Sequence, residues 1–215
     1  MSNVLQFIVL TLGIYFSLFL FWRLLHEDYE DSDIFSLWFV SLSGGILGYF
    51  VFNFFFPQNA LSVSLGIALL FTMLRARRIR MKLFEILESA IPSIFIFLVF
   101  VLISQMIWEI SIPILVDLLL VALALGLFMF LKARYRRFLW YPSGKIGFAS
   151  LATVLVYFVI RAAVALTLGT MLSFKLVLFS LPETLVLGLT IGMTSLVLLY
   201  VRSGRRDLAR FFNNK

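Results

Sequence analysis

The stretch LVYFVIRAAVAL, residues 155–166, decides the fold because every position in it except Arg161 is apolar. It belongs to a longer apolar run, residues 146–169, which has the length that a helix needs to cross a bilayer. An uncompensated charge in hydrocarbon costs about 3 kcal/mol to more than 10 kcal/mol. The run therefore predicts a membrane helix in which Arg161 requires a carboxylate partner or a bound anion.

The composition of the whole chain indicates an integral membrane protein. Of its 215 residues 62% are hydrophobic and 17% aromatic, and the mean hydropathy is +1.07. The charged residues, 13% of the chain, gather between apolar runs that each approach the length of a membrane span. We therefore predict an all-α polytopic protein with seven transmembrane helices, at about 4–22, 34–56, 59–74, 84–106, 112–132, 146–169 and 174–201.

The basic residues predict the orientation of these helices. Sixteen of the 18 Lys and Arg residues follow the first, third, fifth and seventh predicted helices, whereas Lys175 falls on the opposite side. By the positive-inside rule the N-terminus lies outside and the C-terminus is cytoplasmic. We expect one transmembrane domain, residues 1–201, followed by a basic tail, residues 202–215, in the bacterial cytoplasmic (inner) membrane. The net charge of +7 then reflects topology and contact with anionic lipid, and no nucleic-acid partner is expected.

Residues that bind metals or act as nucleophiles are scarce in this chain. It has no cysteine, and His26, the single histidine, falls in the acidic connector after the first predicted helix. A metal site, a cofactor and thiol chemistry are therefore not expected.

Three charges are predicted to share one layer of the membrane. With a rise of 1.5 Å per residue, Asp117, Arg161 and Glu183 each lie about 10–12 Å below the outer face. Glu183 is the expected partner of Arg161 across the last helical hairpin, and Pro182 is expected to bend that helix beside the charges. An ion pair that joins two helices explains this layer, and so does an outward-facing cavity in which Arg161 holds a phosphate. The residues alone leave both readings open.

Several short motifs occur in the order found in one known family. They are GGILGY at 44–49, ESAIPS at 88–93, a Pro and an acid in the fifth helix (Pro113, Asp117), YFVIR at 157–161 and SLP at 180–182 followed by a glycine. In this order the chain resembles bacterial prolipoprotein diacylglyceryl transferases over its whole length.

The resemblance implies transfer of a diacylglyceryl group from phosphatidylglycerol to the cysteine of a lipoprotein signal peptide. Arg161, Glu183 and Asp117 are then the expected catalytic residues. Residues expected to bind substrate are Tyr157, which has the family's spacing to the arginine, and Tyr49, Gly48, Ser64 and Gln105 from the other motif positions.

The chain also departs from the family pattern at positions that matter for this chemistry. Ile46 and Leu102 stand where the family has arginines, Ser64 stands for a histidine, Gln105 for an asparagine and Ala165 for a glutamate. Thiol attack needs a base, and departure of a phosphate needs positive charge. The departures leave three readings: a rebuilt transferase, a non-catalytic lipid-binding or assembly protein on the same scaffold, and a small transporter.

Overall fold

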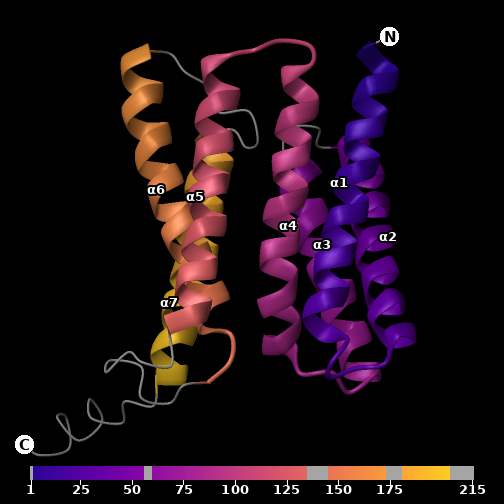
Figure 1. Cartoon of the computed structure of the whole chain (residues 1–215). Helices are drawn as coiled ribbons and strands as arrows, with labels where there is room; N and C mark the ends of the chain where they lie inside the picture. Colours follow the sequence, from indigo (N-terminus) through magenta and orange to yellow (C-terminus); the bar gives the residue numbers. More distant parts are fainter. Residues whose placement is uncertain (1, 56–59, 135–144, 173–180, 204–215) are drawn as a thin grey trace, which may run out of the picture. The chain divides into compact units, whose positions relative to one another are not determined.

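The computed structural model describes residues 2–55, 60–134, 145–172 and 181–203, and all secondary structure in them is helical. The predicted all-α fold is thereby confirmed. Helix α3 extends one turn beyond its predicted end, and the described part of α7 begins at Leu181. The helices are α1 (Ser2–Leu25), α2 (Asp31–Phe55), α3 (Ala60–Arg78), α4 (Leu83–Met106), α5 (Ile112–Arg134), α6 (Phe148–Leu172) and α7 (Leu181–Ser203) (Figure 1).

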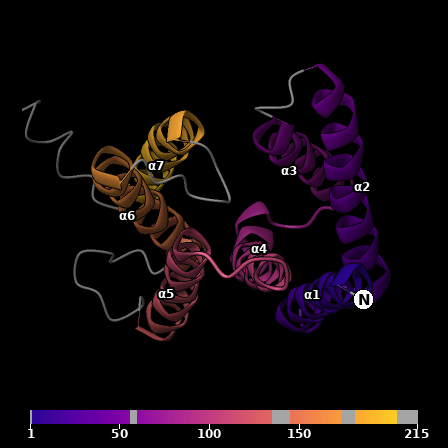
Figure 2. The ribbon, with the colours of Figure 1, turned by 90° about the horizontal axis from the view of Figure 1, so that it is seen from above.

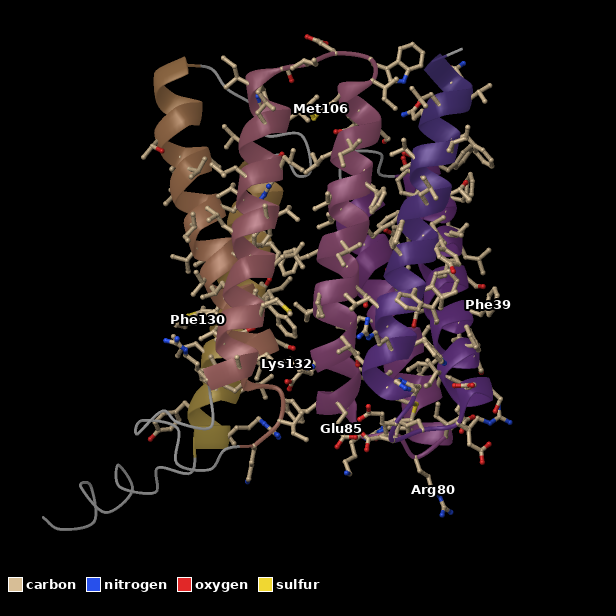
Figure 3. All side chains as sticks on the ribbon, in the orientation of Figure 1. Phe39, Arg80, Glu85, Met106, Phe130 and Lys132 are labelled. Atoms are coloured by element: carbon tan, nitrogen blue, oxygen red, sulfur yellow. The ribbon has the colours of Figure 1, made fainter. Side chains whose placement is uncertain are left out.

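Five of these helices, α1, α2, α4, α5 and α6, are long and apolar enough to cross a membrane. Within the described ranges, α7 contains a shorter apolar stretch, Gly188–Arg202. Large apolar side chains are exposed on these helices; Phe54 is 83% and Phe7 71% accessible. Phe39 on α2 also points away from its neighbours (Figure 3). Such surfaces are stable against lipid chains, so the protein is membrane-embedded.

The chain divides into two compact units, residues 1–108 (unit 1) and residues 109–215 (unit 2). In unit 1, α1 packs against α4 and α2, and α2 packs against α3 (Figure 2). Gly13 permits the α1–α4 contact, because a Cβ atom there would lie 2.5 Å from the Cβ of Phe100. Gly44 permits the α2–α3 contact in the same way, with Phe71 Cγ at 2.9 Å from its added Cβ.

A polar network ties together the connectors at one end of unit 1. The Tyr29 hydroxyl donates to the carboxylate of Glu85, which also pairs with Lys82 Nζ at 3.0 Å. Burial, together with this hydrogen bond to Glu85, raises the pKa of Tyr29. Trp22 Nε1 on α1 donates to Asp31, the first residue of α2, at 2.7 Å. These contacts hold the α1–α2 and α3–α4 connectors together above an apolar cluster that includes Phe21, Leu25, Ile34, Leu37 and Met81.

Helix α3 ends in a Schellman cap. The Met81 amide donates to the Ala76 carbonyl at 3.0 Å, and the Arg80 amide donates to the Arg77 carbonyl at 3.4 Å. Arg80 adopts a positive φ of 58°, a conformation that glycine adopts at lower cost. Both Ala76 and Met81 are buried, as the apolar contact of this motif requires. Arg80 and Glu85 thus lie at the same end of unit 1, opposite Met106 (Figure 3).

In unit 2, α6 packs against both α5 and α7. The α6–α7 contact is close at Gly188, where an added Cβ would lie 3.6 Å from the carbonyl oxygen of Phe158. The face of α5 that is buried includes Val121, Ala124 and Phe128, and Asp117 lies on the same helix. Most side chains buried between these helices are apolar. Asp117 and Arg161 are the charged residues buried among them in the described part of unit 2.

Candidate functional site

The charged centre of unit 2 is an ion pair between α5 and α6. Arg161 Nη1 donates to the carboxylate of Asp117, and both side chains are 0% accessible. Asp117 is in the second turn of α5 and Arg161 is in the middle of α6, and their contact places the two charges at one level, as the sequence predicts. The pair carries no net charge, which removes most of the penalty for placing a guanidinium in an apolar interior.

The structure identifies Asp117 as a partner of Arg161, whereas the sequence pointed to Glu183. The predicted layer of charge is correct for Asp117 and Arg161. The side chain of Glu183 and residues 173–180 lie outside the described part of the chain. Participation of Glu183, and a bend at Pro182, stay predictions.

Tyr157 lies one turn before Arg161 on α6 and belongs to the same centre. Its hydroxyl accepts a hydrogen bond from Arg161 Nη1 at 3.4 Å, and the Arg161 Cζ atom lies 6.0 Å from the centroid of its ring. Tyr157 is 5% accessible. The guanidinium thus has a carboxylate and a phenol as neighbours, both within the packed interior of unit 2.

This arrangement has a direct chemical consequence. An anionic ligand of Arg161 would have to compete with a carboxylate that is already desolvated and charge-assisted in its hydrogen bond. It would also have to reach a guanidinium with no accessible surface. The geometry is therefore that of a structural pair that joins two helices rather than that of an open anion site.

The other predicted substrate-binding residues belong to unit 1. Gly48 on α2 and Ser64 on α3 are brought together, since an added Cβ on Gly48 would lie 3.2 Å from Ser64 Cα. Tyr49 is 43% accessible on the outer surface of α2. Gln105 is half-buried in the last turn of α4, and its Oε1 atom has no hydrogen-bond partner among the described residues. Gly48 and Ser64 thus lie at the contact between α2 and α3, and neither Tyr49 nor Gln105 is brought to them by a described contact. Substrate binding by these four residues stays a prediction.

Three of the positions that depart from the family pattern have apolar side chains. Leu102 is 0% accessible in α4, and Ile46 is 46% accessible on α2. Ala165 is buried on α6. None of these three side chains offers a charge or a proton, so the catalytic groups expected there are not replaced at the same positions.

The sequence did not single out three buried polar residues of unit 2, which are Ser150, Thr153 and Ser195. The most deeply buried of them is Thr153. It is 0% accessible and lies two turns before Arg161 on the same face of α6. The signal was available in the sequence, because Thr153, Tyr157 and Arg161 recur at intervals of four along this helix.

Among the described residues no group of three or more His, Cys, Asp or Glu side chains is placed to hold a metal ion. Comparison of the chain with protein-family models, with curated proteins and with solved structures found no match. The candidate function therefore rests on the chemistry of the residues themselves.

Proposed function

We propose that the chain is a seven-span protein of the bacterial cytoplasmic membrane, with its N-terminus outside, that binds phospholipid without catalysing diacylglyceryl transfer. In this proposal it shares the scaffold of the prolipoprotein diacylglyceryl transferases, and the Arg161–Asp117 pair holds α5 to α6. Phosphatidylglycerol-like lipids are its expected ligands. Its expected role is in membrane assembly.

The observation that carries the proposal is the complete burial of Arg161 together with its pairing to Asp117. A transferase needs its guanidinium exposed to a lipid phosphate, and it needs a base for the attacking thiol. The apolar side chains of Ile46 and Leu102 support the same conclusion, because they stand where the family pattern has arginines.

A rebuilt transferase is the second candidate, and one observation favours it. Tyr157 and Arg161 keep the spacing of the family motif and are in hydrogen-bond contact. If Asp117 releases the guanidinium when a lipid enters, the same residues would bind the phosphate and a lipoprotein signal peptide would be the acceptor. A transporter has no such support in the residues described.

The two candidates differ in a simple assay. The purified protein in nanodiscs of phosphatidylglycerol is mixed with a lipobox peptide, and release of glycerol phosphate is measured. We expect no release, and no rescue of cells depleted of their lipoprotein transferase, although phosphatidylglycerol raises the midpoint of thermal unfolding above that in phosphatidylcholine.

The matched variants are Arg161→Ala and Arg134→Ala. Arg134 is an exposed arginine at the end of α5, so its loss should leave the unfolding midpoint close to wild type. Arg161→Ala should lower the unfolding midpoint. Release of glycerol phosphate by wild type that Arg161→Ala abolishes, at unchanged expression, would establish the transferase instead.

A further inference from the structure

A polar stripe follows the buried face of α6. Ser150, Thr153, Tyr157 and Arg161 are spaced by three, four and four residues, which places them on one side of the helix. Their accessibilities are 1%, 0%, 5% and 0%. The stripe covers about 16 Å along the helix axis at 1.5 Å per residue. It begins near the start of α6 at Phe148 and ends at the ion pair with Asp117.

Thr153 is the unusual member of this stripe. Within a helix, a threonine hydroxyl normally donates to the carbonyl three or four residues before it. In unit 2 this is seen for Thr167 with Ala163 at 2.9 Å and for Thr190 with Val186 at 2.7 Å. By contrast, the hydroxyl of Thr153 is fully buried and makes no hydrogen bond to any described residue.

A buried hydroxyl without a partner is disfavoured, because it has lost its hydrogen bonds to water and gained none in return. Internal water fills such a role in proteins when two or more polar groups line the same space. Around Thr153, the groups on the same face of α6 are the hydroxyls of Ser150 and Tyr157, one turn away on either side.

We propose that unit 2 binds internal water at Thr153, along the stripe that leads to the Arg161–Asp117 pair. The ligand of this site is water, held by the Thr153 hydroxyl and by its neighbours on α6. Under the predicted orientation the stripe starts at the cytoplasmic end of α6, which is the side from which this water would enter. The site does not depend on lipid binding or on transfer chemistry.

The test is labelling of the full-length protein in nanodiscs by hydroxyl radicals generated from water by a short X-ray pulse, read by mass spectrometry. Radicals formed from a bound water oxidise the side chains that touch it, even when these are buried. Tyr157 is the reporter, and Phe158 is the control, since it is also buried, 8% accessible against 5% for Tyr157, and lies beside Gly188 of α7. We expect Tyr157 to be labelled at least fivefold faster than Phe158. Equal rates would overturn the proposal.

Two substitutions at Thr153 sharpen the result. Thr153→Ser keeps the hydroxyl and should keep the fast labelling of Tyr157, whereas Thr153→Val keeps the volume and should slow it to the rate of Phe158. The unfolding midpoint provides a second measurement. A dry site predicts that Thr153→Val raises the midpoint while labelling stays unchanged, and that outcome would also refute the water site.

Discussion

The buried pair predicts a large and non-additive effect of substitution. Replacing Asp117 by Leu leaves the Arg161 guanidinium without its carboxylate, and replacing Arg161 by Met leaves the carboxylate alone. Loss of one partner of a buried pair costs about 3–5 kcal/mol, whereas replacing both by apolar side chains of similar volume is near neutral or stabilising. For a chain of this length each single substitution should lower the unfolding midpoint by about 6–20 °C, at about 2–4 °C per kcal/mol.

The double variant Asp117→Leu/Arg161→Met should instead unfold within a few degrees of wild type. Unfolding of the variants is followed by circular dichroism in detergent. Arg134→Met, an exposed substitution on α5, is the control and should have no effect. Small and additive effects of the two single substitutions would refute the reasoning, and would indicate a guanidinium that is already hydrated or bound to an anion.

Three further predictions concern unit 1. Arg80→Gly should raise stability by about 0.5–1 kcal/mol in thermal unfolding, because glycine adopts the positive φ at the end of α3 without strain; a loss of stability would contradict the cap. Gly13→Ala should destabilise by about 1–3 kcal/mol, since its Cβ would collide with Phe100, whereas Gly66→Ala, with open space around it, should not. Burial and the hydrogen bond to Glu85 raise the pKa of Tyr29 above its ordinary 10.0, so the stability it contributes is present below about pH 10 and is lost as the pH rises further. Tyr29→Phe should remove this alkaline loss from the unfolding midpoint measured against pH, and an unchanged profile would exclude Tyr29 as its source.

Hydropathy predicted the helices well because membrane spans are set by length and apolarity, which are properties of the local sequence. The boundaries were less accurate where a cap decides them. The cap at Arg80 depends on a backbone conformation that the sequence RARRIRM does not signal, since arginine seldom adopts a positive φ. The sequence therefore predicted where α3 lies but ended it one turn early.

The candidate site was predicted in part. A common level for Asp117 and Arg161 follows from counting residues along each helix, and their pairing confirms that the two lie at one level. Which acid pairs with Arg161 depends on the rotation of α5 and α7 about their axes, and a count along the axis does not give that rotation. The burial of Thr153 had a signal in the spacing, but its missing hydrogen bond depends on a side-chain rotamer.

The pairing of α1 with α4 has a consequence for how the chain is made. The indole of Trp108 donates to Gln6 across 102 positions of sequence, so the partner of α1 leaves the ribosome only after α2 and α3 have been synthesised. In unit 2 each helix packs against the one synthesised next to it. During biosynthesis the surface of α1 around Gly13 therefore contacts lipids or insertion factors until α4 has been synthesised. Nascent chains that stop before α4 are expected to be the ones that cellular proteases remove.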